Sequence, residues 1–471
     1  MSQAAKASAA HALHTSILRE YDIRGIVGET LHAADAYVIG QAFATLVAEK
    51  TSKESPTIAL GRDGRLSSPE LADSLSQGLQ SAGAHVLSVG VGPTPMLYFG
   101  VYHLEADAGM MVTGSHNPPT HNGVKIMLGR HSFFGEDIRE LGRRIERGTH
   151  RSAKGSEARH DIFDAYVQAL LNASSTTSKR KLTIAWDAGN GAAGQVSEAL
   201  AAHLKEATHH VLNATIDGAF PNHHPDPSVP KNLVQLQETV NTNRCDIGLA
   251  FDGDGDRLGA VDDKGRIISS DHLLMLFGRQ VLTQQSGATI IADVKTSQSV
   301  FDDVKAHGGS PLMWKTGHSH IKSKMKEVHA AFAGEASGHI FFADRYYGYD
   351  DGLYAALRLI ECVAEQDGPL SALIDTLPTQ YSTPEIRIDC SESRKFAIID
   401  EVKARLQQSG ADFCDIDGVR VNCPQGWWLL RASNTQAAII ARCESPTSNG
   451  LSVLSDQLKT QLSASGITLS L

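Results

Sequence analysis

Residues 57–89 read TIALGRDGRLSSPELADSLSQGLQSAGAHVLSV, and this stretch indicates the fold class. Residues 57–60 form a short apolar run, as expected of a buried strand. A polar cap followed by Pro69 predicts a helix after the glycine-marked turn, with a leucine at every fourth position of its apolar stripe. Residues 85–89 are a second β-rich run. A strand, a helix and another strand in this order predict an α/β fold.

The same alternation recurs over most of the chain and predicts three α/β domains, followed by a smaller, strand-rich α+β domain. The charged and small residues 149–160 are interpreted as a linker after the first domain. The expected boundaries place the four domains at residues 1–155, 156–262, 263–372 and 373–471. A chain of 471 residues is long enough for three or four domains, because a domain typically takes ~150 residues.

Composition limits the compartment and the partners. Hydrophobic residues make up 41% of the chain and charged residues 20%, which is ordinary for a globular protein. No apolar run approaches the ~20 residues of a membrane-spanning helix, and residues 1–18 lack the apolar core of a secretory signal. We therefore expect a cytoplasmic protein with reduced cysteines and no membrane partner. The formal net charge of −10 argues against a nucleic-acid surface, so an anionic ligand would need a local group of cations in a cleft.

The sequence Thr113-Gly-Ser-His-Asn-Pro118 follows the apolar run 110–112 and places Ser115 at the end of a predicted strand. Ligands of α/β proteins bind at this edge of the sheet. A phosphorylated serine needs cations on its oxygens and an acceptor in line with its phosphorus. His116 is a candidate for proton exchange and Lys125 for phosphate neutralisation. The same hexapeptide is equally typical of a plain turn after a strand.

The sequence Asp252-Gly-Asp-Gly-Asp-Arg257 places three carboxylates on alternate residues of a glycine-rich loop between two predicted strands. Such a loop is suited to Mg²⁺, which prefers oxygen ligands and often completes its shell with phosphate. Arg257 fits a site in which phosphate shares the ion. An EF-hand calcium loop is disfavoured, because Arg257 stands at the position that requires glycine and strands replace the helices. A solvated acidic turn without an ion is the other interpretation.

Two further loops carry polar groups after predicted strands. In Gly334-Glu-Ala-Ser-Gly-His339, Glu335 and Ser337 are two residues apart and would face the same side of an extended backbone, where they could hold neighbouring hydroxyls. In Arg431-Ala-Ser-Asn-Thr435, a guanidinium, two hydroxyls, an amide and successive backbone N–H groups could hold a phosphate. A polar turn explains the first loop equally well, and the start of an N-capped helix explains the second.

Two other patterns suggest different chemistry. Gly189-Asn-Gly-Ala-Ala-Gly194 matches the dinucleotide-binding fingerprint, and Asp217 stands at about the distance of a ribose-binding acid. An NAD-dependent dehydrogenase is therefore an alternative function, although it leaves Ser115, the acidic loop and Arg431 without a role. The pair His223-His224 lies in a proline-rich loop without cysteine or a second spaced pair, so a zinc site is not expected there.

Taken together, the loops resemble those of the α-D-phosphohexomutase superfamily over nearly the whole chain, and the sugar loop resembles the bacterial phosphomannomutase/phosphoglucomutase branch. The matching segments are Tyr21-Asp-Ile-Arg-Gly25, Gly61-Arg-Asp-Gly-Arg65, Thr113 to Pro118, Phe220 to Pro227, Asp252 to Arg257, Lys315-Thr-Gly-His318, Gly334 to His339 and Arg431 to Thr435. The resemblance implies three Rossmann-like mixed α/β domains and a smaller C-terminal α+β domain around a central cleft. One departure is Gln436-Ala437, where relatives often carry Glu-Pro, so this loop leaves the fine specificity undetermined.

The resemblance also implies roles for individual residues. Catalytic roles fall to Ser115, His116, Lys125 and Arg257, and the metal ligands are Ser115, Asp252, Asp254 and Asp256. Substrate-binding roles fall to Tyr21, Arg24, Lys295, His318, Glu335, Ser337, His339, Arg431, Ser433, Asn434 and Thr435.

The activity implied by the resemblance is the interconversion of hexose 1-phosphate and hexose 6-phosphate, with mannose and glucose phosphates as substrates. It proceeds through phosphoserine 115 and a hexose 1,6-bisphosphate that turns end over end, with Mg²⁺ as cofactor. A phosphoglucosamine mutase of the same superfamily is the nearest alternative. The expected partners are hexose phosphates, and the expected assembly is a monomer or a homodimer.

Overall fold

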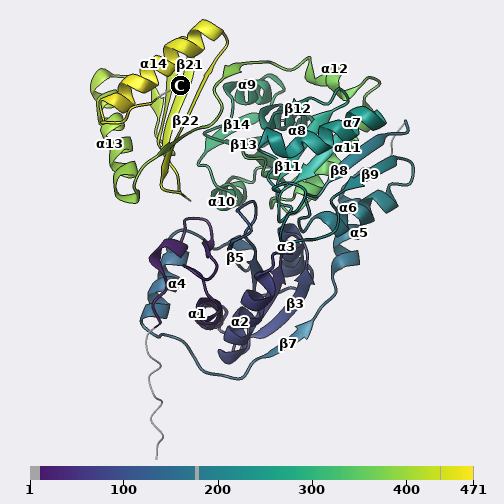
Figure 1. Ribbon diagram of the computed structural model, residues 1–471, viewed down its shortest axis with the longest axis vertical. Coiled ribbons are helices and arrows are strands. Elements are labelled where there is room, and N and C mark those ends of the chain that lie inside the picture. The colour runs from purple at the N-terminus through teal and green to yellow at the C-terminus, as the bar shows by residue number, and fades with distance from the viewer. Residues whose placement is uncertain (1–10, 176–179, 435, 470–471) are drawn as a thin grey trace, which may run out of the picture. The chain divides into compact units, whose positions relative to one another are not determined.

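The computed structural model describes residues 11–175, 180–434 and 436–469. The described residues form two compact units. Figure 1 colours the chain by residue number, from purple at the N-terminus to yellow at the C-terminus. The first contains the described residues up to Ser269 together with Ser337–Leu373, and the second contains Ser270–Ala336 and the described residues from Ile374 onward.

The N-terminal sheet of the first unit has the strand order β1-β5-β4-β2-β3-β7, with β6 paired to β5. β2, β3, β4 and β7 run parallel, whereas β5 is antiparallel to both β1 and β4. The strands are β1 (Ile23–Ile26), β2 (Thr57–Arg62), β3 (His85–Val91), β4 (Ala108–Val112), β5 (His121–Leu128), β6 (His131–Ser132) and β7 (Ser156–Arg159). The helices are α1 (Ala33–Thr51), α2 (Ser68–Ser81), α3 (Thr94–His103) and α4 (Glu136–Glu146), preceded by a 3-10 turn at Thr15–Ile17.

The helix predicted from the leading sequence is α2. Ser67 precedes it and Pro69 lies in its first turn, and the leucine stripe is fully buried in the core of this domain. Residues 149–160 are not a plain linker, because β7 lies within them and pairs in parallel with β3. β7 is a largely exposed edge strand of sequence Ser-Glu-Ala-Arg, so it lacks the apolar run that marks the other strands.

The second sheet of the first unit has the order β12-β11-β10-β8-β9. β10 and β8 are parallel, and β10 and β11 form an antiparallel hairpin around the acidic loop. The strands are β8 (Thr183–Asp187), β9 (Thr208–Leu212), β10 (Ile247–Phe251), β11 (Leu258–Asp262) and β12 (Ile267–Ile268). The helices are α5 (Phe163–Ala173), α6 (Gly194–His203), α7 (Val234–Asn243), with a 3-10 turn at Pro230–Leu233, and α11 (Gly352–Glu365); β16 (Ile340–Phe342) precedes α11.

The second unit contains a parallel sheet in the order β14-β13-β15 and an antiparallel C-terminal sheet. The first sheet comprises β13 (Thr289–Asp293), β14 (Ser310–Trp314) and β15 (Phe332–Gly334), with α8 (Ser270–Gln284), α9 (Gln298–Ala306) and α10 (His318–Val328). The C-terminal sheet comprises β17 (Tyr381–Ser382), β18 (Ile386–Asp389), β19 (Phe413–Cys414), β20 (Val419–Cys423), β21 (Gly426–Ala432) and β22 (Ala438–Ser445). The remaining helices of this unit are α13 (Glu392–Ser409) and α14 (Ser448–Ser463), and α12 (Leu370–Ile374) spans the point in the chain where the first unit ends at Leu373.

The C-terminal sheet confirms the expected α+β class of the last part of the chain. Its order is β17-β22-β21-β20-β19, with β18 also paired to β22. Residues of α13 and α14 share one apolar cluster with the strands, and Figure 1 shows these two helices beside β21 and β22. Trp428 and Leu430 of β21 are buried in this cluster, as their alternation in the sequence requires.

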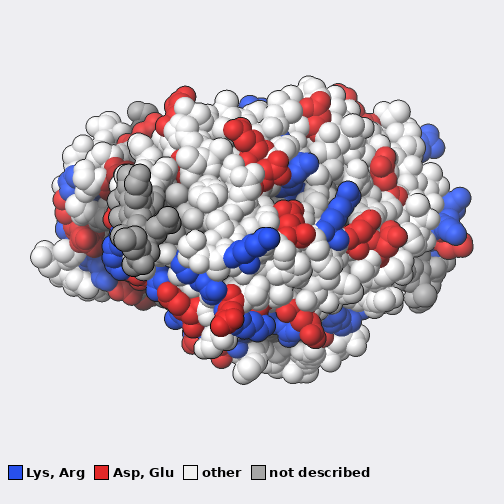
Figure 2. Space-filling view, turned by 90° about the horizontal axis from the view of Figure 1, so that it is seen from below, with Lys and Arg blue, Asp and Glu red and all other residues white. Residues whose placement is uncertain are grey.

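The surface carries charges of both signs. On the face shown in Figure 2, Lys and Arg are interspersed with Asp and Glu and form no continuous basic area. Among the residues that the structure describes, no helix has the length and apolar character needed to span a membrane.

Candidate active site

Ser115 lies in the turn between β4 and β5 and adopts a left-handed backbone conformation, with φ of 48°. A non-glycine residue in this region is uncommon and marks a turn held by its surroundings. The Ser115 side chain is buried, and its backbone N–H donates to Thr113 Oγ1 at 2.8 Å. Burial and these contacts fix the hydroxyl at the carboxyl end of a central strand.

Arg65 holds the serine loop through its backbone. Its Nη2 donates to the carbonyl oxygens of Ser115 and Asn117, both at 2.6 Å. Its Nη1 donates to the carbonyl oxygens of Pro118 at 2.6 Å and His121 at 2.9 Å. Arg65 is 1% exposed, so these charge-assisted hydrogen bonds are protected from water. The sequence motif that contains Arg65 gave no hint of this role.

The acidic loop meets the serine loop at close range. Asp252, Asp254 and Asp256 are all fully buried at the end of the β10–β11 hairpin. The Ser115 hydroxyl donates to Asp252 Oδ2 at 2.9 Å. Gly253 is required for this approach, because a Cβ at this position would lie 2.4 Å from the carbonyl oxygen of Ser115. The predicted serine and acidic loops therefore form one site.

Lys125 of β5 is the buried cation of this site. Its Nζ donates to Asp254 Oδ2 at 2.7 Å and forms a second, shorter contact with Asp256. Burial would lower the pKa of Lys125, but Asp254 and Asp256 outweigh it and raise the pKa well above its usual value. Lys125 therefore carries its charge in this arrangement.

The three aspartates have divergent pKa values. Burial, with the charges of Asp254 and Asp256, raises the pKa of Asp252 well above its usual value. Burial acts in the same direction on Asp254, but Lys125 and the Thr94 hydroxyl, which donates at 2.5 Å, lower the pKa of Asp254. Asp254 is thus the carboxylate that stays ionised most firmly.

The donor set of this loop fits a hard divalent cation. One oxygen from each of Asp252, Asp254 and Asp256 lies within 4.8 Å of the others. Asp254 Oδ1 and Asp256 Oδ1 are buried without a hydrogen-bond donor among the described residues. Buried carboxylate oxygens without donors are costly unless an ion satisfies them. An all-oxygen set suits Mg²⁺ better than a softer ion, and strands in place of helices exclude the EF-hand interpretation.

Arg257 and His339 continue the site on its other side. Arg257 Nε donates to His339 Nε2 at 3.0 Å, and the Arg257 backbone N–H donates to Asp252 Oδ1 at 3.1 Å. His339 Nδ1 lies 3.0 Å from Asp350 Oδ2 and 3.5 Å from Asp256 Oδ1. Asp350 was missed from the sequence, because it follows His339 by eleven residues in a loop with no recognisable motif.

His116 and Arg24 border the serine. His116 Nδ1 lies 3.2 Å from Ser115 Oγ, and burial, with the charges of Arg257 and Arg24, lowers the pKa of His116 well below its usual value. His116 is therefore the neutral imidazole near neutral pH. Arg24 Nη1 donates to Gly114 O at 2.7 Å, and Tyr21 is partly exposed just before β1.

The second unit brings together another set of predicted residues. His318 begins α10 and is 8% exposed. Glu335 is buried and accepts a hydrogen bond from Gly317 N at 2.5 Å. The expected extended backbone from Glu335 to Ser337 is wrong, because β15 ends at Gly334 and a turn follows. Ser337 is partly exposed and belongs to the first unit, whereas Glu335 belongs to the second.

The loop of Arg431 is a hairpin connection. β21 and β22 pair on either side of it, so the interpretation as a helix start is wrong. Arg431 is 4% exposed, and its Nε donates to Asp417 Oδ2 at 2.9 Å. Lys395 Nζ donates to the Ser433 carbonyl at 2.6 Å and keeps the loop in place. Asn434 is partly exposed, and the predicted contribution of Thr435 lies outside the described residues.

Asp417 is a third residue, after Arg65 and Asp350, that the sequence did not single out. Its Oδ2 also accepts the backbone N–H of Thr316 at 3.1 Å, so it joins the Arg431 hairpin to the loop before α10. Lys295 lies after β13, and its Nζ donates to Glu385 at 3.0 Å. Lys295, Asp417 and Arg431 thus belong to contacts between the parallel sheet and the C-terminal sheet of the second unit.

The glycine-rich loop 189–194 is not arranged for a dinucleotide. A strand precedes it and a helix follows it, as predicted. However, the N–H groups of Asn190, Gly191 and Ala192 donate to protein carbonyls, that of Ala192 to Gly253 at 2.9 Å. These donors are the ones that a pyrophosphate would need. The loop instead holds the acidic loop in place through the hydrogen bond from Ala192 N–H to the Gly253 carbonyl.

The two adjacent histidines are also structural. His224 Nε2 donates to the His116 carbonyl at 2.6 Å, and His223 Nε2 lies 2.9 Å from Asp187 Oδ2. Within the described residues, neither histidine belongs to a group of three metal-type ligands.

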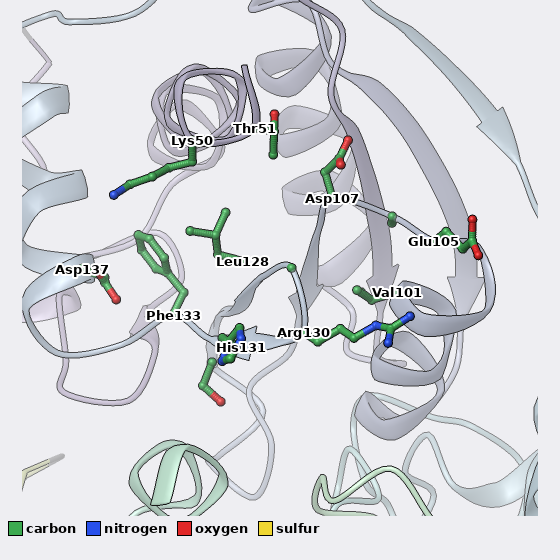
Figure 3. A pocket seen from close by; sticks show the side chains of 13 residues that line it. Lys50, Thr51, Val101, Glu105, Asp107, Leu128, Arg130, His131, Phe133 and Asp137 are labelled. Atoms are coloured by element: carbon green, nitrogen blue, oxygen red, sulfur yellow. The ribbon is translucent and has the colours of Figure 1, made fainter. Parts of the chain in front are cut away.

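A cavity of about 610 Å³ lies elsewhere in the first unit, as Figure 3 shows. The end of α1, the loop before β4 and the β5–β6 turn contribute its side chains. Lys50 and Arg130 face it together with Glu105, Asp107 and Asp137. This mixture of charges selects no ligand class, and none of the predicted site residues lines the cavity.

Comparison with known proteins gives a consistent assignment over all four domains. Models described as phosphoglucomutase/phosphomannomutase alpha/beta/alpha domains I, II and III match residues 15–152, 164–265 and 269–381. The model of the phosphoglucomutase/phosphomannomutase C-terminal domain matches residues 385–460.

Individual proteins agree over the same length. A phosphomannomutase/phosphoglucomutase of Pseudomonas aeruginosa is 44% identical over 456 residues, which cover 96% of each chain. A phosphoglucomutase of Neisseria gonorrhoeae is 45% identical over 94% of this chain and 96% of its own. A crystal structure of a phosphoglucomutase/phosphomannomutase family protein from Burkholderia thailandensis superposes with a TM-score of 0.89 at 41% identity, covering 97% of this chain and 98% of that one. The chain therefore belongs to the phosphoglucomutase/phosphomannomutase family of the α-D-phosphohexomutase superfamily.

Proposed function

We propose that this chain is a phosphohexomutase that interconverts hexose 1-phosphates and hexose 6-phosphates, with mannose and glucose phosphates as its substrates. The contact between Ser115 Oγ and Asp252 Oδ2, 2.9 Å apart in a buried site, is the observation that carries the proposal. The Ser115 hydroxyl thus lies beside three carboxylates suited to a divalent ion, as a phosphoserine carrier requires.

In the proposed reaction, phosphoserine 115 transfers its phosphoryl group to the free hydroxyl of a hexose monophosphate. The resulting hexose 1,6-bisphosphate rotates end over end in the site. Its other phosphoryl group is then transferred to Ser115. When bound, Mg²⁺ at Asp252, Asp254 and Asp256 supplies positive charge to the phosphoryl oxygens. Arg65 keeps the serine loop in place through both half-reactions, since it binds backbone carbonyls that the chemistry does not change.

Other residues transfer protons or stabilise the charge of the transferred phosphoryl group. Neutral His116, whose Nδ1 lies 3.2 Å from Ser115 Oγ, is proposed to pass the proton of the attacking substrate hydroxyl to the serine oxygen that leaves. Lys125 holds its proton and contributes charge. Arg257 is oriented by His339 and supports the transferred group. Arg431, with Ser433, Asn434 and Thr435 of its hairpin, is proposed to hold the phosphate that is not reacting.

The test is direct. The purified protein should carry phosphate on Ser115, and Ser115→Ala should fold normally but lose nearly all turnover of glucose 1-phosphate. Ser152→Ala, at an exposed serine of the same unit, is the matched control and should keep both phosphate and turnover. Intact-mass measurement and peptide mapping locate the phosphate. Phosphate on a different residue, or an active alanine variant at position 115, would overturn the mechanism.

Sugar preference depends on the turn after β15. The backbone N–H of Ala336 donates to Asp293 Oδ1 at 3.1 Å, so this residue is fixed and its methyl group offers no hydrogen bond. Phosphoglucosamine mutases, the nearest alternative, tend to carry glutamine here. We expect glucose and mannose 1-phosphates to turn over within about a hundredfold of each other, since one lost hydrogen bond costs ~1–3 kcal/mol. Glucosamine 1-phosphate should be the slowest of the three in coupled assays, and the opposite order would move the chain to the alternative branch.

A further inference from the structure

The backbone around Lys295 is clamped by arginines of the C-terminal sheet. Arg420 Nη1 donates to the carbonyl oxygens of Val294 at 2.8 Å and Thr296 at 2.7 Å. Arg442 Nη1 donates to the carbonyl oxygen of Lys295 itself at 2.7 Å. Three successive carbonyls are therefore held, and the position from which the Lys295 side chain extends is fixed.

The ammonium group of Lys295 pairs with a carboxylate that is far more exposed than Lys295 itself. Its Nζ donates to Glu385 Oε2 at 3.0 Å, and the side chains are 12% and 51% exposed respectively. The place of Glu385 is set by the fold, because Thr383 N donates to Cys443 O at 3.0 Å and Ile386 pairs with Ala441. A half-exposed carboxylate thus lies opposite a largely buried ammonium.

Further positive charge acts on this carboxylate. Partial burial would raise the pKa of Glu385, but Lys295 and then Arg431 and Arg442 lower it. Glu385 is therefore an anion within a group of three cations from both sheets of the second unit. Arg431 is the cation of this group to which the proposed function assigns a phosphate contact, and Lys295 is one of the predicted substrate-binding residues.

We propose that Glu385 is a built-in substitute for the substrate's phosphate: its carboxylate occupies Lys295 until an incoming phosphate displaces it. The exchange is an ion-pair replacement and forms or breaks no covalent bond. It rests on the proposed function for the identity of the anion. Glu385 would then set the affinity for phosphorylated sugars without taking part in phosphoryl transfer.

The physical balance favours displacement. A phosphate monoester carries about −1.5 to −2 charges at pH 7 and three acceptor oxygens, against one charge and two oxygens for a carboxylate. Glu385 is half-exposed, so its carboxylate is hydrated again when it leaves Lys295 and the release costs little. The clamped backbone keeps the Cα of Lys295 in place when its partner leaves, so only the side chain has to be ordered on binding.

Glu385→Gln tests the proposal, because it removes the charge and keeps the size. Calorimetric titration with inorganic phosphate should show about two- to fivefold tighter binding to the variant, the range expected for an ion pair whose carboxylate is half-exposed. KM for glucose 1-phosphate should fall by a similar factor, with kcat unchanged or lower. Asp389→Asn, at the end of the strand that follows Glu385, is the matched control, because Asp389 is 90% exposed and pairs with Arg387 at 3.5 Å.

Lys295→Met completes a double-mutant cycle with Glu385→Gln. It should weaken phosphate binding, and adding Glu385→Gln to it should bring no further change. The proposal would be overturned if Glu385→Gln bound phosphate no more tightly than the native protein. It would also be overturned if Glu385→Gln tightened phosphate binding as much in the Lys295→Met background as in the native one. Binding of inorganic phosphate is read without turnover, so a protein that fails to act on hexose phosphates would refute the proposed function and leave this test intact.

Discussion

Replacing Lys125 by methionine tests whether the acidic loop is balanced by this cation. Lys125 and its partners Asp254 and Asp256 are buried, and Lys125 Nζ contacts both carboxylates. Removing one partner of a buried ion pair costs about 3–5 kcal/mol, because the remaining charge stays buried without compensation. A change of 1 kcal/mol shifts the melting midpoint of a 150–250-residue domain by roughly 2–4 °C. In chelator, Lys125→Met should therefore lower the first unfolding transition by about 6–20 °C.

Mg²⁺ should reverse part of this loss, since a divalent ion at the same carboxylates replaces the missing charge. Saturation at a hundredfold excess over Kd contributes about 2.7 kcal/mol, and the variant should gain more from Mg²⁺ than the native protein does. Differential scanning calorimetry with EDTA and with Mg²⁺ measures both effects. Lys53→Met is the matched control, because Lys53 pairs with Asp107 at 2.6 Å but is 53% exposed. A Lys125→Met protein that melts like the native one in EDTA would refute this account of the charge balance.

Three further outcomes are expected. Chelation should abolish turnover and Mg²⁺ restore it, and Asp254→Asn should remove the dependence together with the activity; full rate in chelator would make the loop structural. Arg431→Ala should lower kcat/KM about 30- to 150-fold, for a lost charge-assisted contact worth ~2–3 kcal/mol, with the Ser115 phosphate content unchanged by mass spectrometry. Burial raises the pKa of Asp351 to about 6, so the folded state binds a proton more tightly and the free energy of unfolding should fall as pH rises from about 4 to 6. Asp351→Asn should flatten that slope in urea titrations, and an unchanged slope would assign it to other groups.

The fold could be predicted where apolar runs end at glycine-marked turns. The predicted runs 57–60 and 110–112 lie inside β2 and β4, whose residues are almost all buried. β7 escaped prediction because an exposed edge strand needs no apolar residues. The four domain boundaries stay predictions.

The candidate site was predictable only to the extent that its chemistry lies in short motifs. Ser115 and the three aspartates stand in such motifs, and the structure brings them within hydrogen-bonding distance. Arg65 and Asp417 act on backbone groups that tertiary structure alone brings near, so nothing in the local sequence marks them. The turn after β15 was misjudged because alternation in the sequence does not show that a strand has already ended.

The four carbonyl contacts of Arg65 have a consequence for redesign. They fix the path of the loop from Ser115 to His121 through atoms that every amino acid possesses. Side chains after His116 on that path, from Asn117 to His121, can therefore be exchanged, for instance to admit a bulkier sugar, without relocating the nucleophile. Arg65 itself tolerates no such freedom, because lysine has no planar fork to reach several oxygens at once. Libraries that aim at new specificity should vary the loop residues 117–121 and keep Arg65.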